Sequence, residues 1–233
     1  MALPKINSSP RYELVIPSTG QTIRYRPYLV KEEKVLMIAF ESGDQKQAMQ
    51  AIADTLEACI QEDITVRKLP TFDVEYLFSQ IRSKSVGEVA SIILKCSECD
   101  TQNDYSLDVS SITVDVPDLD KDVQLTEDIV VNLKFPEYES MIKSKFDGTR
   151  LSDGFSMIGA CIDSILTEEE RYDVADVPER ELDEFLESLT TEQFSKITEF
   201  LSKVPTIEHK AEFACGQCGH DNEVTLRGLK DFL

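Results

Sequence analysis

Four of the six cysteines in this 233-residue sequence occur as two CxxC pairs, the residue pattern best suited to chemistry in the chain. The pairs are Cys96 with Cys99 and Cys215 with Cys218. Two residues between cysteines allow a tight turn to direct both sulfur atoms at one ion, and four thiolates complete a tetrahedral zinc shell. The sequence therefore predicts a structural Zn²⁺ site with these four ligands and with no open position for catalysis.

Other uses of the cysteines fit the sequence less well than zinc does. Two disulfides would need an oxidising compartment, and we expect no signal peptide because the first residues lack an apolar core and a cleavage pattern. A redox CxxC is normally followed by a helix, whereas strands are expected here. An iron–sulfur cluster uses the same four ligands and stays an alternative. His220 lies close enough to Cys218 to replace a sulfur, but we expect it outside the shell. Cys59 and Cys161 lie on apolar helix stripes, where we expect buried core thiols.

The segments around the two pairs align without a gap, as KCSECDTQNDYSL and ACGQCGHDNEVTL. Asn103 and Asn222 occupy equivalent places in this alignment, and an alternating strand pattern flanks each pair. We therefore expect two β-hairpins with a zinc knuckle at each tip, which together form a split zinc ribbon. Asp100 and Gly219, each directly after a second cysteine, suit the left-handed backbone of such a knuckle.

The two pairs are separated by 115 residues, which is long for a compact zinc ribbon. Closing such a loop costs roughly 4 kcal/mol, whereas structural zinc supplies about 10–16 kcal/mol in finger peptides. The metal can therefore hold the ends of a long insertion together. We expect three segments: an N-terminal α+β region with the first knuckle (1–135), an acidic helical insertion (136–205) and a C-terminal hairpin with the second knuckle (206–233).

The periodicity of apolar residues predicts an α+β fold with a mainly helical insertion. The predicted strands are 12–16 and 22–26 as a hairpin, 89–95, 105–109, 123–125 and 129–135 as a second hairpin, 208–214 and 223–226. The predicted helices are 31–40, 44–60, 72–83, 136–145, 154–166, 179–188 and 191–203. Thr71 is expected to cap the helix 72–83, and Thr190 with Gln193 is expected to form a capping box.

The charge of the chain is strongly negative, at −20, and unevenly distributed. Residues 1–99 hold 12 basic and 13 acidic side chains, whereas residues 100–233 hold 12 basic and 31 acidic ones. This balance argues against sequence-independent nucleic-acid binding and against docking on an anionic membrane. The densest acidic stretch, residues 163–187, is interpreted as a solvated helix face, with a docking surface for a basic partner as the alternative.

Motifs of catalysis are missing from the sequence. We find no G-x-S-x-G, Walker loop, dinucleotide fingerprint or H-E-x-x-H, and no run of about 18 apolar residues that would span a bilayer. The two histidines, His209 and His220, lie near the second cysteine pair and inside no motif. We therefore expect a non-enzymatic protein without a small-molecule substrate.

Three stretches carry a resemblance to a known family: the opening LPKINSSPRYELVIPSTGQTIRYRPYLVKEEKVLMIA, the segment FDVEYLFSQIRSKSVGEVASIILKCSEC and the acidic SITVDVPD. They resemble the baseplate hub assembly proteins of T-even-like contractile-tailed phages, most specifically in residues 26–33 and 72–87. The resemblance implies a structural or assembly protein, either a hub subunit or a chaperone. Its partners would be other phage baseplate and tail proteins, in the host cytoplasm during assembly or in the virion tail baseplate. The alternative is a zinc-ribbon adaptor that binds nucleic acid, a role drawn from fold analogy alone.

Overall fold

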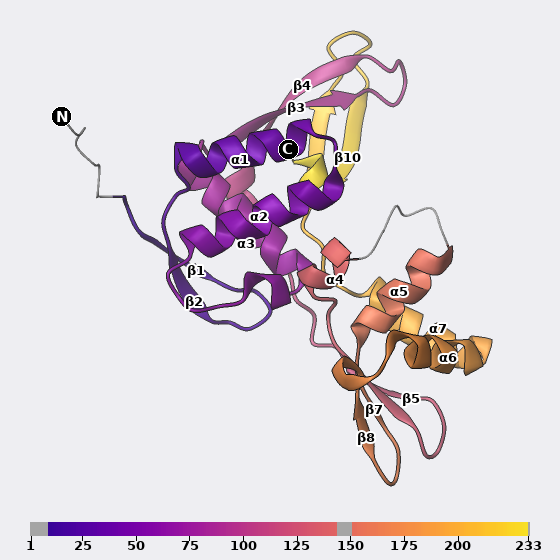
Figure 1. Ribbon diagram of the computed structural model, residues 1–233. Helices are drawn as coiled ribbons and strands as arrows, with labels where there is room; N and C mark the ends of the chain where they lie inside the picture. Colours follow the sequence, from indigo (N-terminus) through magenta and orange to yellow (C-terminus); the bar gives the residue numbers. More distant parts are fainter. Residues whose placement is uncertain (1–8, 144–150, 233) are drawn as a thin grey trace, which may run out of the picture. The chain divides into compact units, whose positions relative to one another are not determined.

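The computed structural model describes residues 9–143 and 151–232 as a mixed α and β chain (Figure 1). The chain divides into two compact units. The first contains the residues up to Val66, Phe72–Asp115 and the residues from Thr206 onward. The second contains Arg67–Thr71 and Val116–Pro205. No helix in the described ranges combines the length and apolar character that a bilayer crossing requires.

The first unit begins with an antiparallel hairpin and continues with three helices. The hairpin is β1 (Tyr12–Val15) with β2 (Thr22–Tyr25), and the helices are α1 (Val30–Glu41), α2 (Gln45–Cys59) and α3 (Thr71–Ser85). All five elements were predicted to within two residues. Their buried side chains and that of Ile16, directly after β1, contribute to the core of the unit, with Ile23, Leu36, Ile52, Leu56, Phe72, Leu77, Phe78 and Ile81 among them.

Hydrogen bonds between neighbouring residues determine where α2 begins. The carboxylate of Asp44 accepts the backbone N–H groups of Lys46 and Gln47, at 2.9 and 3.2 Å, and so caps α2. The predicted cap at Thr71 is wrong. Helix α3 starts at Thr71 itself, so the hydroxyl lies within the first turn, where it is buried and has no hydrogen-bond partner in the described part of the chain.

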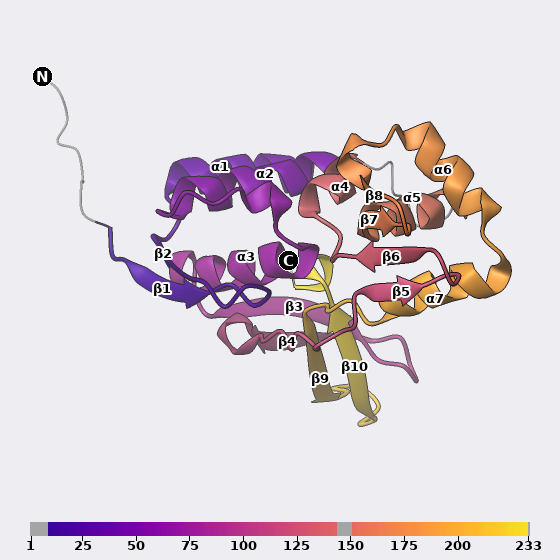
Figure 2. The ribbon, with the colours of Figure 1, turned by 90° about the horizontal axis from the view of Figure 1, so that it is seen from below.

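Two longer hairpins complete the first unit. One pairs β3 (Val89–Lys95) with β4 (Gln102–Asp108), and the other pairs β9 (Glu208–Ala214) with β10 (Asp221–Arg227). Both hairpins are antiparallel, and their residues alternate between exposed and more buried positions. Strand β4 ends at Asp108 and β9 begins only at Glu208, but the two hairpins lie close together (Figures 1 and 2).

The second unit is built on a four-stranded antiparallel sheet in the order β5-β6-β7-β8. The strands are β5 (Asp122–Gln124), β6 (Val130–Leu133), β7 (Ile162–Leu166) and β8 (Arg171–Asp173). The helices are α4 (Tyr138–Lys143), α5 (Leu151–Cys161), α6 (Glu179–Ser188) and α7 (Thr191–Ser202). Sheet and helices share one core, formed by Leu125, Val131, Leu133, Ile158, Ile162, Leu186, Ile197 and Phe200. Short 3₁₀ turns occupy Val66–Lys68, Val109–Ser111, Val174–Asp176 and Leu229–Asp231.

The predicted helix 154–166 is wrong in its last five residues. Helix α5 ends at Cys161, and Ile162–Leu166 form strand β7. Apolar residues at Ile158, Ile162 and Ile165 fit a helical stripe, but β7 lies between β6 and β8 and gains backbone hydrogen bonds on both edges. The pairing partner β6 lies about 30 residues upstream of β7, so the local pattern of apolar residues does not reveal the strand. The insertion 136–205 still holds four helices, α4 to α7, which cover more of it than β7 and β8 do.

Other elements of the second unit agree with the sequence. The predicted hairpin 123–125 and 129–135 is the β5–β6 pair, which joins β7 in one sheet. Helix α6 has the predicted bounds, and the hydroxyl of Thr190 accepts the N–H of Gln193 at 3.3 Å in the expected capping box at α7. The predicted helix 136–145 corresponds to α4, and its last two residues lie outside the described residues.

Candidate metal centre

The tips of the two long hairpins bring together the four cysteines of the CxxC pairs. All four Sγ atoms lie within 4.8 Å of one another. The distance from Cys96 Sγ to Cys218 Sγ is 3.7 Å, and that from Cys99 Sγ to Cys215 Sγ is 3.6 Å. Sulfurs bound tetrahedrally at 2.3 Å from zinc stand about 3.8 Å apart, so these two separations are compatible with a shared metal ion. All four thiols are free of disulfides.

Each cysteine pair sits in a turn of the same construction. The N–H of Cys96 donates to the carbonyl of Thr101 at 2.9 Å, and the N–H of Cys215 donates to that of His220 at 2.8 Å. The residue after each second cysteine has a positive φ, 56° at Asp100 and 71° at Gly219. The predicted left-handed backbone is confirmed at both positions, and it lets the chain reverse while both sulfurs stay on one side.

Asn103 and Asn222 each bind the cysteine turn of the opposite hairpin. Asn222 Nδ2 donates to Cys96 Sγ at 3.6 Å, and its Oδ1 accepts the backbone N–H of Ser97 at 2.9 Å. Asn103 Nδ2 donates to Cys215 Sγ at 3.8 Å, and its Oδ1 accepts the backbone N–H of Gly216 at 2.9 Å. The sequence alignment had matched these two asparagines, but it could not show that each binds the opposite knuckle.

The electrostatics of the cluster suit a cation at its centre. The backbone N–H groups of Cys218 and Gln217 lower the pKa of Cys215 to about 6. The N–H of His220 acts to lower the pKa of Cys218, but the other three sulfurs and burial together raise it to about 12. Four thiols this close therefore cannot all ionise without a positive charge between them. Sulfur donors with N–H···S hydrogen bonds fit a soft or borderline cation such as Zn²⁺.

The remaining cysteines and histidines lie outside this cluster. Cys59 and Cys161 are buried, as predicted, and burial raises the pKa of their thiols to about 11 and about 12. His220 contributes backbone groups to the turn rather than a ring nitrogen to the cluster. His209, which lies in no sequence motif, has its Nε2 3.2 Å from the hydroxyl of Tyr105 and so links β9 to β4.

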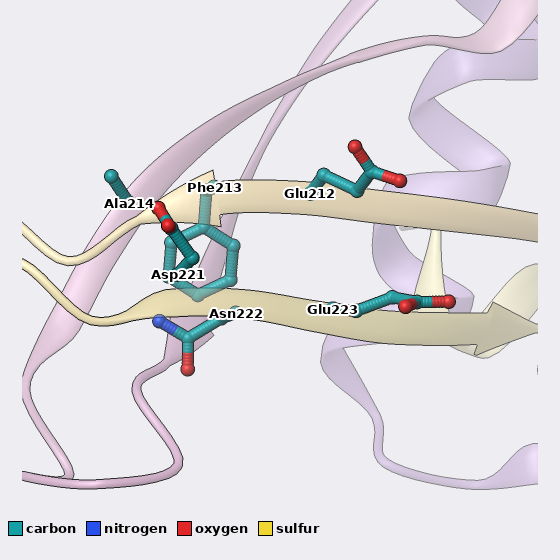
Figure 3. A pocket seen from close by; sticks show the side chains of 6 residues that line it. All are labelled: Glu212, Phe213, Ala214, Asp221, Asn222 and Glu223. Atoms are coloured by element: carbon teal, nitrogen blue, oxygen red, sulfur yellow. The ribbon is translucent and has the colours of Figure 1, made fainter.

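Beside the cluster, strands β9 and β10 border an open hollow (Figure 3). Glu212 and Glu223 lie opposite each other in the strand register and extend their exposed carboxylates from this surface. Phe213 and Asn222 complete its lining together with Ala214 and Asp221. The carboxylates of the hollow are therefore solvated groups on the outer surface of the hairpin.

Comparison with known proteins identifies the class of molecule that carries this cluster. The chain belongs to the family of T4 bacteriophage base plate proteins, whose sequence model matches residues 9–233. It is 25% identical over 224 residues to the baseplate hub assembly protein gp26 of Enterobacteria phage T4, and the match covers 95% of this chain and 97% of that protein. These matches confirm the resemblance inferred from the sequence. No solved structure matches the chain.

Proposed function

We propose that this protein takes part in assembling the baseplate hub of a contractile-tailed phage, as a hub subunit or an assembly chaperone. The observation that carries the proposal is the match to a baseplate hub assembly protein over nearly the full length of both chains. Its partners would be other baseplate and tail proteins. It would act in the host cytoplasm during assembly, and in the tail baseplate if it stays in the virion.

The chemistry of the site supports a role in binding rather than catalysis. Four cysteine sulfurs converge in the described chain, and four protein ligands leave a metal no free position for a substrate. The protein would therefore act through its surfaces, without enzymatic activity and without a small-molecule substrate.

Within this role, the four cysteines would hold one structural Zn²⁺ and the two hairpins would form a split zinc ribbon around it. The spacing of the sulfurs, the matching turns and the crossed asparagines support this assignment. The outward-facing charges of β9 and β10 include the acidic residues Glu208, Glu212, Asp221 and Glu223 against Lys210 and Arg227, which does not favour the alternative role as a nucleic-acid adaptor.

Metal analysis of protein purified without chelator tests the site. We expect one zinc per chain, and Cys99→Ser or Cys218→Ser should lower both the metal content and the stability, because metal binding is coupled to folding. Cys59→Ser is the matched control, since it changes a buried thiol outside the cluster. Iron in place of zinc would establish the iron–sulfur alternative, and the absence of both metals would refute the site.

Affinity capture from infected cells, compared with mass spectrometry of purified particles, tests the role in assembly. We expect baseplate or tail proteins to be enriched with the bait. A stoichiometric presence in particles identifies a resident subunit, whereas capture without such a presence identifies a chaperone. A bait that enriches no baseplate or tail protein would contradict the proposed function.

A further inference from the structure

Helix α1 (Val30–Glu41) exposes more apolar side chains than it buries. Its buried residues are Glu32, Leu36 and Ala39. Its exposed apolar side chains, which are 38–79% accessible, are Val30, Val35, Met37, Ile38 and Phe40. The buried stripe of α1 is narrow, and it faces the first unit's own interior. An exposed apolar cluster of this size on one helix is typical of an interaction surface.

Two of the exposed apolar residues, Val30 and Met37, share one stripe of the helix with two charged residues, Lys34 and Glu41. Val30, Lys34, Met37 and Glu41 are four, three and four residues apart, so they line one stripe of the helix. Ile38 lies beside this stripe. A repeat of four and three residues is the pattern with which one helix packs along another. The surface is therefore suited to a second helix rather than to a strand or a small ligand.

The charges on this stripe specify the direction of the second helix. Lys34 lies towards the start of α1 and Glu41 at its end, about 10 Å further along the axis. Neither side chain has an ion-pair partner among the described residues of its own chain. In an antiparallel pair of identical helices, Lys34 of each copy comes close to Glu41 of the other, with Met37 and Ile38 at the centre. A parallel pair would instead place Lys34 against Lys34.

The net charge of the surrounding segment permits this approach. The chain carries −20, but residues 1–99 contain 12 basic and 13 acidic side chains, so the repulsive charge is concentrated elsewhere in the sequence. A surface that is complementary to itself about a twofold axis is the usual basis of a homodimer. We propose that α1 is a dimerisation surface on which the α1 helix of a second copy docks in antiparallel orientation. This inference is independent of the metal and of the proposed function.

Analytical ultracentrifugation of the full chain tests the proposal, over roughly 1 to 100 µM protein. We expect a monomer–dimer equilibrium for the unchanged protein. Lys34→Glu or Glu41→Lys alone places like charges together twice in the dimer and should weaken association roughly tenfold. The double variant with both changes restores opposite charges and should recover the dimer. Ile38→Asp should abolish association.

Ile93→Asp is the matched control, because Ile93 is an exposed isoleucine on β3 with 62% accessibility, close to the 58% of Ile38. Circular dichroism checks that each variant is folded. A monomeric wild-type protein throughout the range would overturn the proposal, as would a double variant that fails to recover or an equal effect of Ile93→Asp. A monomer whose Ile38→Asp variant loses a captured baseplate protein would assign α1 to a different partner and equally refute self-pairing.

Discussion

Replacing Asn222 with aspartate tests how the two knuckles hold the cysteine cluster. Asn222 is 5% exposed. Its Nδ2 donates to Cys96 Sγ at 3.6 Å and to the carbonyl of His220 at 2.9 Å, and its Oδ1 accepts from the N–H and the hydroxyl of Ser97. Aspartate keeps the shape and the acceptor. It removes both donated hydrogen bonds and places a carboxylate beside a thiolate.

The magnitude follows from these contacts. Two lost hydrogen bonds cost about 2 kcal/mol together. Two negative charges about 4 Å apart repel by about 4 kcal/mol at the effective dielectric constant of a partly buried site. Asn222→Ala removes the hydrogen bonds alone and should weaken zinc binding about 10–100-fold, as is common for residues that orient metal ligands. Asn222→Asp should weaken it at least about tenfold more than alanine does.

Competition with a chromogenic zinc chelator near neutral pH measures these affinities. Asn103→Asp should behave in the same way, because Asn103 makes the equivalent contacts to Cys215 and Gly216. Asn132→Asp is the control. Asn132 donates to Asp122 in the second unit, so the new carboxylate also lies beside a negative charge but far in sequence from the cysteines. If Asn222→Ala binds zinc more weakly than Asn222→Asp, packing rather than charge governs the site and the argument fails.

Three further predictions follow from the same structure. Gly219→Ala should destabilise the protein by about 1 kcal/mol in thermal unfolding, because the φ of 71° is strained for any residue with a Cβ atom; an unchanged melting temperature would contradict this. Burial raises the pKa of Glu75 from 4.5 to about 7, although the hydrogen bond from the N–H of Leu229 acts to lower that pKa. The folded state therefore binds a proton that the unfolded chain has released, so the free energy of unfolding should fall by up to about 3 kcal/mol as pH rises from about 4.5 to about 7. Urea titrations of Glu75→Gln should lack that slope. Chelator treatment of a zinc-loaded chain should lower amide-exchange protection in β3, β4, β9 and β10 and leave β5–β8 unchanged, and a uniform loss would show that the two units unfold together.

The sequence predicted the local features of the cysteine turns because those features depend on neighbouring residues. The two cysteines, the left-handed residue after them and the flanking strands lie within one short segment each. The crossed contacts of Asn103 and Asn222 were not predictable, because they join residues more than 110 positions apart. The same limit explains β7, whose strand conformation depends on pairing with β6 and β8 rather than on its own apolar pattern.

The order of the segments along the chain has a consequence for how a metal would act. The first unit is assembled from three separate segments, and the last of them, from Thr206 onward, supplies β9, β10 and two of the four cysteines. Most of the second unit is one continuous segment, Val116–Pro205, which lies between the two cysteine pairs. The second unit therefore does not include the C-terminal hairpin, whereas the first unit is complete only with it. A metal bound by both pairs adds its free energy to the one step that closes the long loop, and it can offset the roughly 4 kcal/mol of closure entropy. A metal in the cysteine cluster would thus stabilise the join between the segment Phe72–Asp115 and the segment from Thr206 onward.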